Sequence, residues 1–244
     1  MNPQPSPAAG SRHAGPHPGA LAIVYTVLFM AGLTFVSAFG LPMGVKAPYW
    51  PGPWEPASVI ASYFQTHRPA VLICTFLQIG ALIPLGIYAA TVVSRLRFLG
   101  VTAAGAYIAL FGGFMTVFDG TAAGFTSWAV IHSAVGQGPA FTTTLYYLSF
   151  AFGGPGFSIP MGLLIAGVSI TSGFGKLLPK WIVGFGLLLA LAGEVSWLSL
   201  VLPKAILLIP LVRFPGFIWL IAAGFALPRT PERTLQAPAV GASA

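Results

Sequence analysis

Three ionisable side chains, Asp119, Glu194 and Arg213, lie inside long apolar segments. Charged groups are costly in hydrocarbon, face the protein interior, and mark functional sites. Glu194 lies eight residues before Leu202, where one apolar segment ends. Arg213 lies eight residues after Ala205, where the next apolar segment begins. With a rise of about 1.5 Å per residue, both lie about 12 Å below one tight turn. The spacing therefore predicts an ion pair, which either fixes two helices or serves a ligand-binding or proton-exchanging site.

Few other polar groups lie in the apolar segments that carry these three ionisable residues, and an enzyme normally brings together more. Asp119 lies near the end of its segment, where it either meets water or joins Arg213, whose side chain can extend toward the interface. An amide and a hydroxyl in apolar segments either line a polar pocket or link helices. The candidate ligand-binding residues are Asp119, Glu194, Arg213, Gln78, Tyr147 and Gly154.

Motifs for metal binding, phosphate binding and nucleophilic catalysis are missing from the sequence. Asp119 and His132 fall short of the three or four ligands of a usual metal site. No histidine lies in the core of an apolar segment, so haem ligation is not expected. We predict no metal and no cofactor, and catalytic residues are not identified.

Gly154 belongs to a segment, Gly153–Pro160, that contains three glycines and two prolines. Glycine costs about 1 kcal/mol and proline about 3 kcal/mol relative to alanine inside a helix. In a membrane, freed backbone groups must be satisfied by other protein or by a water-filled cavity. The segment predicts a broken helix facing the interior, which either shapes helix packing or forms a binding site, as in many transporters.

Composition identifies the solvent around these segments as lipid. Of the 244 residues, 56% are hydrophobic and 6% are charged, and the mean hydropathy is +0.86. Soluble domains carry about 25% charged residues. The net charge of +7 would suggest nucleic acid in a soluble protein, but the basic residues gather at segment ends, where they meet lipid headgroups. We exclude nucleic acid as a partner, and the single Cys74 allows no internal disulfide.

The chain is predicted to be an all-α, polytopic transmembrane bundle with about six spans, the fourth broken at Gly153–Pro160. A span needs about 20 apolar residues. Disordered tails are expected at 1–20 and 228–244, around a membrane domain at 21–227. The predicted spans are 21–41, 69–93, 100–122, 141–170, 181–202 and 205–227.

Shorter features complete the layout. Residues 57–67 predict a short interfacial helix or an ordered loop, after a Trp- and Pro-rich segment. Residues 123–140 are too interrupted to span again and predict an extended third helix or an interfacial turn. Gly105, Ala109 and Gly113 form a stripe of small residues that would let helices approach closely.

Lys and Arg near the span ends set the orientation. With the N-terminus inside, the inner side carries Arg12, Arg95, Arg97, Lys176, Lys180, Arg229 and Arg233, against Lys46, Arg68 and Lys204 outside. We therefore expect a multi-pass plasma (inner) membrane protein with both termini in the cytoplasm.

The run His67-Arg68-Pro69, a long apolar helix, Arg95-Leu96-Arg97 and a further helix resembles uncharacterised small bacterial inner-membrane proteins with about six spans. The resemblance covers residues 57–113, under a third of the chain, and contains no catalytic motif. It implies a bacterial inner-membrane protein and nothing about activity.

Three functions remain open. The first is binding or transport of a small hydrophobic or anionic ligand, or service as an accessory membrane subunit. The second is a membrane-embedded enzyme acting on a lipid or isoprenoid, with Asp119 and Glu194 as acid and base. The third is a purely structural subunit of a membrane complex. Besides the bilayer, the expected partners are such a ligand or another membrane protein.

Overall fold

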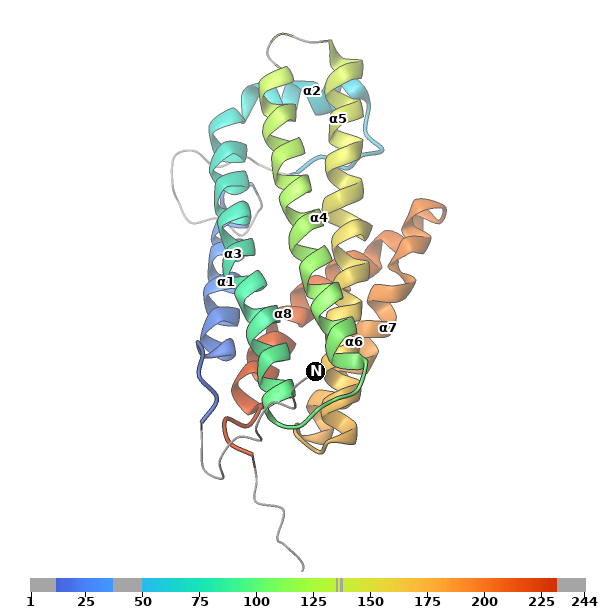
Figure 1. Cartoon of the computed structure of the whole chain (residues 1–244). Helices are drawn as coiled ribbons and strands as arrows, with labels where there is room; N and C mark the ends of the chain where they lie inside the picture. The colour runs from blue at the N-terminus through green and yellow to red at the C-terminus, as the bar shows by residue number, and fades with distance from the viewer. Residues whose placement is uncertain (1–11, 37–49, 135, 137, 232–244) are drawn as a thin grey trace, which may run out of the picture.

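The structure is a computed structural model that describes residues 12–36, 50–134, 136 and 138–231, and within these ranges it is helical with no strand. The helices form one elongated bundle, with a short helix lying across one end (Figure 1). The α-helices are α1 (Pro18–Thr34), α2 (Ala57–Thr66), α3 (Arg68–Phe98), α4 (Gly105–Ser133), α5 (Pro139–Ala151), α6 (Phe157–Phe174), α7 (Lys180–Val195) and α8 (Leu208–Ala226). The short turns are a π-helix at Phe152–Gly156 and 3-10 helices at Ser196–Leu200 and Pro203–Leu207.

Five helical segments of the described chain are long and apolar enough to cross a membrane. They are Arg68–Phe98, Gly105–Ser133, Pro139–Phe174, Lys180–Leu200 and Pro203–Ala226. α1 is also apolar, but it has 17 residues, at the lower limit for a span, and is not among these five. The predicted all-α membrane bundle is confirmed.

The start of α1 differs from the sequence prediction, and α4 takes one of the two forms predicted for residues 123–140. α1 begins at Pro18, within the predicted tail, because His17 accepts a hydrogen bond from Gly19 and proline suits a helical first turn. The predicted end of this span at 37–41 lies outside the described residues. α4 continues to Ser133, because glycine is tolerated where neighbouring helices pack closely. The short helix predicted at 57–67 is present as α2.

The outer surface of the bundle is apolar, as lipid requires. Aromatic and aliphatic side chains project from the outward faces of α3, α4 and α7, with exposures of 75% for Phe76, 70% for Phe114 and 69% for Leu188. Monomeric soluble proteins rarely expose contiguous apolar surface of this kind. The buried polar side chains are mostly Ser and Thr. Thr116 and Thr171 donate to backbone carbonyls one turn earlier, whereas Ser158, Ser169 and Ser172 have no hydrogen-bond partner among the described residues.

Close helix crossings depend on glycine. A Cβ added at Gly112 of α4 would lie 2.5 Å from the backbone nitrogen of Leu164 and 2.6 Å from the carbonyl oxygen of Pro160 on α6. A Cβ added at Gly167 of α6 would lie 2.4 Å from the carbonyl oxygen of Gly105. Gly105 and Ala109 of the predicted stripe thus pack against α6, and Gly113 packs against Ala89 of α3, so the stripe allows close helix approach as predicted. At Gly112 and Gly167 the neighbouring atoms are backbone and cannot move aside for a side chain.

We predict that Gly112→Ala destabilises the protein by about 1–3 kcal/mol, the usual cost of overpacking. The measurement is thermal unfolding of the purified protein in detergent. Gly184→Ala is the matched control, because Gly184 is on α7 with no atom within 4 Å of its added Cβ. Equal melting temperatures for the two variants would contradict the role assigned to the α4–α6 crossing.

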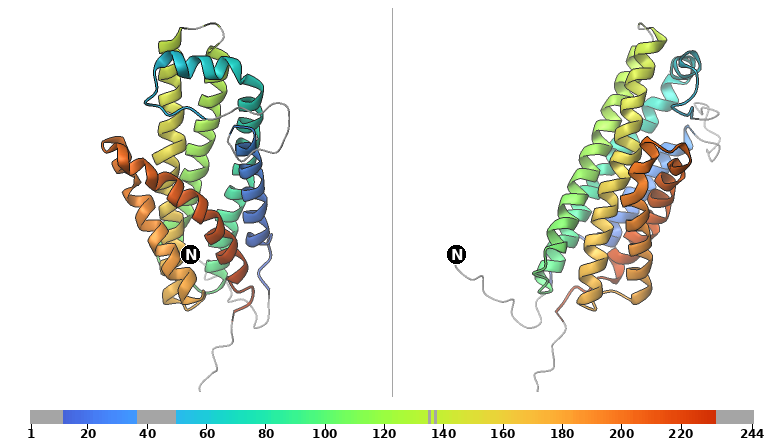
Figure 2. Two further views of the ribbon diagram at one scale, coloured as in Figure 1. Left: turned by 180° about the vertical axis from the view of Figure 1, so that it is seen from behind. Right: turned by 90° about the vertical axis from the view of Figure 1, so that its right-hand side faces the viewer.

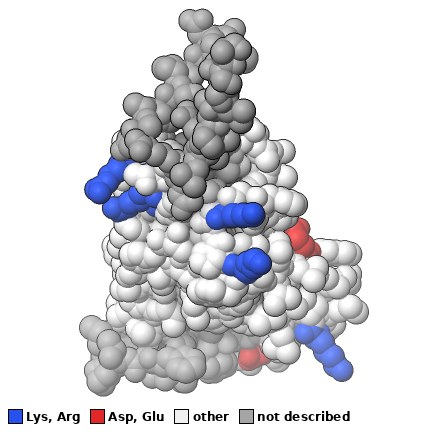
Figure 3. Space-filling view, turned by 90° about the horizontal axis from the view of Figure 1, so that it is seen from below, with Lys and Arg blue, Asp and Glu red and all other residues white. Residues whose placement is uncertain are grey.

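The first and last described residues, Arg12 and Pro231, lie at the same end of the bundle as the α3–α4 and α6–α7 connections (Figures 1 and 2). Lys and Arg side chains are spread over this end when it is viewed from below (Figure 3). His13 donates its backbone N–H to Arg229, and Arg95 donates to the Leu227 carbonyl, which ties the end segments to α3. Burial, and less strongly the Arg95 charge, lowers the pKa of His13.

The hairpin between α7 and α8 stops well short of the opposite end, which α2, α4 and α5 form (Figures 1 and 2). Its tip carries Lys204 and exposed apolar residues such as Leu200 and Leu207. The side of the bundle above this tip is therefore not covered by α7 and α8.

Candidate functional site

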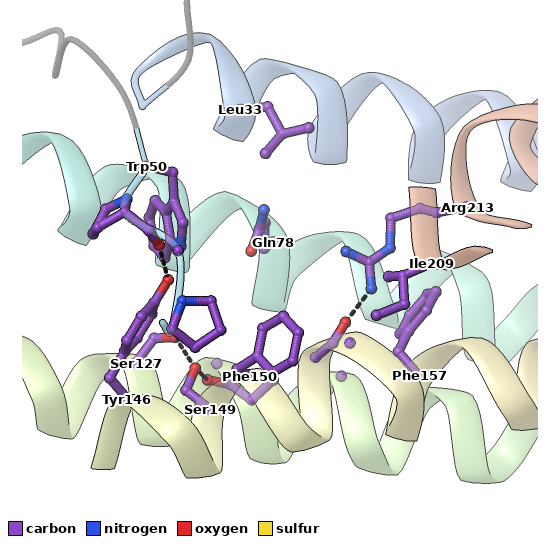
Figure 4. Close-up of a pocket in the computed structure, with 18 of the residues that line it drawn as sticks. Leu33, Trp50, Gln78, Ser127, Tyr146, Ser149, Phe150, Phe157, Ile209 and Arg213 are labelled. Atoms are coloured by element: carbon purple, nitrogen blue, oxygen red, sulfur yellow. Dashed lines mark hydrogen bonds between the residues drawn. The ribbon is translucent and has the colours of Figure 1, made fainter. Parts of the chain in front are cut away.

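A cavity of about 480 Å³ opens above α8, between α1 and α5. One wall comes from α3 and α4. The lower end in the orientation of Figure 1, at the right of Figure 4, comes from α8 and the π-helical turn, and the upper end, at the left of Figure 4, comes from residues 50–55. The side chains that line it are mostly apolar and aromatic, with a few polar groups, as in small-molecule sites. They include Phe29, Leu33, Gln78, Leu82, Ser127, Tyr146, Ser149, Phe150, Phe157, Ile209 and Arg213.

The predicted break in the fourth span takes the form of a π-helical turn, Phe152–Gly156, within a helix that continues from Pro139 to Phe174. Pro155 has no N–H to give to the carbonyl four residues earlier, and a π-turn shifts the bonding by one residue. The N–H of Phe157 bonds the Gly154 carbonyl rather than that of Gly153. The Gly153 carbonyl is thus available to another group, and it faces the cavity.

Arg213 is the group that binds the Gly153 carbonyl. Its Nη2 donates a hydrogen bond to Gly153 across the lower end of the cavity (Figure 4). The guanidinium carbon lies 4.5 Å from the ring centre of Phe157 and 5.4 Å from that of Phe29. Aromatic faces attract a cation and partly replace its hydration. Within the described chain, Arg213 has no carboxylate partner and its buried Nε has no hydrogen-bond acceptor.

The upper end of the cavity is a loop held by side chains of the bundle. The Tyr146 hydroxyl of α5 donates to the Pro51 carbonyl, and Trp50 packs against Tyr146 and Phe64 at ring-centre distances of 6.4 and 5.7 Å. The Gly52 N–H donates to Glu55 Oε1 at 3.0 Å, which closes a tight turn. Glu55 is the only acidic residue among the described residues that line the cavity.

Between these ends lie an amide and two hydroxyls. Gln78 points into the space from α3 (Figure 4), and among the described residues its side chain has no hydrogen-bond partner. Ser127 and Ser149 bond each other at 2.6 Å, and Ser149 also reaches the Ala123 carbonyl. Gln78 is therefore the polar group in the middle of the cavity that is left for a ligand.

The structure gathers three of the six predicted ligand-binding residues, Arg213, Gln78 and Gly154, around this cavity. The other three do not line it. Tyr147 is 52% exposed on the outer face of α5. Asp119 lies beside Gly156, with its carboxyl carbon 3.6 Å from a Cβ added there.

The predicted ion pair between Glu194 and Arg213 is wrong. Glu194 faces α6, where its Oε1 lies 3.2 Å from a Cβ added at Gly162, and this oxygen is buried without a partner in the described chain. Arg213 faces the cavity and Gly153. Counting residues from the turn gave the depth of each side chain, but packing set the direction in which each one points around its helix axis.

Sequence reasoning missed the cavity role of Ser127, Ser149 and Phe157. The composition after residue 122 left an extended third helix and an interfacial turn as alternatives, so the position of Ser127 inside the bundle did not follow from the sequence. A signal was present, because Gly120, Gly124 and Ser127 recur at helical spacing and continue one small-residue face. Trp50 belongs to the Trp- and Pro-rich segment before α2, for which the sequence predicted no role in a cavity.

No family model, curated protein or solved structure matches this chain.

The separation of Glu194 and Arg213 predicts additive mutational effects. The change in the free energy of unfolding of the double variant should equal the sum of the changes in Glu194→Gln and Arg213→Gln to within about 0.5 kcal/mol, as for sites without shared partners. The measurement is a double-mutant cycle of unfolding in detergent. A double variant more stable than that sum by 2 kcal/mol or so would mean that the two charges interact after all.

Proposed function

We propose that this chain is a multi-pass plasma-membrane protein that binds a small amphipathic anion in the cavity, as a ligand-binding or transport protein. The observation that carries the proposal is the Arg213 guanidinium at the inner end of the cavity, without a carboxylate in the described chain. A buried cation is stabilised fully only when a counter-charge accompanies it. An anionic group of a ligand supplies that charge, and the apolar walls take its hydrocarbon part.

The shape of the site supports ligand binding over the alternatives. The cavity ends at Gly153 and Gly154, where a helix with an irregular turn exposes backbone to it, as in transporter binding sites. Asp119 and Glu194, the acid and base of the enzyme alternative, lie outside the lining. A purely structural subunit would have no need of a cavity with a charged end.

The first test is binding of octanoate, a small amphipathic anion, to the purified protein in an uncharged detergent. We expect octanoate to raise the melting temperature in a saturable way. Arg213→Gln should weaken binding about tenfold or more, since a hydrogen bond to a charged group contributes about 1.5–3 kcal/mol. Arg213→Lys keeps the charge but not the guanidinium fork, so partial binding should remain.

Lys204→Gln is the matched control, because it removes one positive charge from the exposed hairpin tip. Its octanoate affinity should equal that of the unaltered protein. If octanoate does not bind, or binds equally well to Arg213→Gln, Arg213 is not the anion site and the proposal fails.

The orientation is part of the proposal. The end with the α3–α4 and α6–α7 connections carries Arg12, Arg97, Lys176, Lys180 and Arg229, and an excess of Lys and Arg favours the cytoplasmic side. Arg68 lies at the opposite end, at the start of α3, and Lys204 lies at the tip of the α7–α8 hairpin, which points toward that end. The cavity and its loop then face the outside of the cell.

Single cysteines in a Cys74→Ala background test this orientation. An impermeant thiol reagent added to whole cells should label Ser58→Cys, an exposed position on α2, and leave Thr230→Cys unlabelled until the cells are opened. Labelling of Thr230→Cys from outside would reverse the assigned topology.

A further inference from the structure

The charged groups in the lining of the cavity lie at its two ends and have opposite signs. Among the described lining residues, Arg213 is the only base and Glu55 the only acid. Arg213 is fixed at the level of Gly153 by its hydrogen bond, and Glu55 is fixed at the loop whose Pro51 carbonyl bonds Tyr146. The cavity is therefore electrically polarised along its length.

The distance between the ends follows from the helix that links them. Tyr146 precedes Gly153 by seven residues, which corresponds to a separation on the order of 10 Å along the helix axis. The walls between are apolar, with Phe29, Leu33 and Leu82 on one side and Phe150 on the other. A ligand that fills this space has a short apolar middle and one polar group at each end.

Glu55 can bind a cation without giving up its place in the loop. Its Oε1 accepts the Gly52 N–H, and its other oxygen has no bond in the described chain. Trp50, Trp54 and Tyr146 line the same end, and aromatic rings favour an ammonium group. This end of the cavity therefore suits a cation, whereas the end at Arg213 suits an anion.

We infer that the cavity selects a zwitterionic ligand, with a carboxylate or similar anion on Arg213 and an ammonium group on Glu55, joined by a short apolar chain. This inference rests on the proposed function, since it uses the same anion site. It adds the second recognition point and the ligand class. Opposite fixed charges orient such a ligand in one direction and disfavour simple fatty anions, which leave Glu55 unpaired.

The test compares three probes of one chain length, ω-aminooctanoate, octanoate and octylamine, by thermal shift on the full chain in uncharged detergent at pH 7. We expect ω-aminooctanoate to bind about tenfold more tightly than octanoate, as one charge-assisted hydrogen bond allows. Glu55→Gln should remove this preference without weakening octanoate binding, because the octanoate complex then leaves no unpaired carboxylate in the cavity. The glutamine keeps an oxygen to accept the Gly52 N–H, so the loop is preserved and octanoate binding reports that the cavity is intact.

The outcomes separate this inference from the proposed function. Equal affinity for ω-aminooctanoate and octanoate, or a preference that persists in Glu55→Gln, would overturn the role of Glu55 while Arg213-dependent octanoate binding still stands. Octylamine binding as tightly as ω-aminooctanoate would also overturn it, because the anionic end would then contribute nothing. Failure of every probe to bind in an Arg213-dependent way would remove the proposed function as well.

Discussion

The placement of one guanidinium inside a membrane-spanning bundle is the constraint that organises the site. Arg213 needs hydrogen-bond acceptors and polarisable neighbours, because the surrounding medium provides little solvation. The protein supplies the Gly153 carbonyl and the faces of Phe157 and Phe29. The carbonyl and the two rings compensate the positive charge of Arg213 only in part, so an anion can supply the rest.

The backbone feature that meets this need comes from Pro155. Because Pro155 has no N–H, the backbone hydrogen bonds of the helix join residues five apart for one turn. The Gly153 carbonyl is then free to accept a hydrogen bond from a side chain. π-turns of this kind are often found at functional sites. Here the turn does not break the helix, so α5 and α6 still form one continuous wall of the bundle.

Glycine packing elsewhere makes the cavity possible. The close α4–α6 contact at Gly112 and the α6–α7 contact at Gly162 and Gly193 draw these helices together on one side. The short α7–α8 hairpin lines only the lower end of the cavity, through Ile209 and Arg213, and the loop at residues 50–55 lines its upper end. Tight packing on one side and an open flank on the other create the space in a bundle of this size.

Asp119 and Glu194 were attractive as functional residues because ionisable groups in apolar segments are rare. In the structure each carboxyl lies beside a glycine of the π-turn or α6, outside the cavity. Their positions separate them from the ligand site proposed around Arg213.

The sequence by itself determined the membrane bundle, its crossing segments, the stripe of small residues on α4 and the irregular turn near Gly153. Each of these follows from composition, periodicity or the chemistry of glycine and proline, which act locally along the chain. The same local rules identified Arg213 and Gln78 as polar groups that require an interior position.

Only the tertiary structure decided what those groups meet. Depth in the membrane follows from counting residues, but the direction of a side chain around its helix depends on how every neighbouring helix packs. That is why Arg213 meets Gly153 and not Glu194, and why the loop carrying Glu55 lies at the other end of the same cavity. Contacts between residues 60 or more positions apart are set by the sum of many helix–helix interfaces, which no single segment of the sequence encodes.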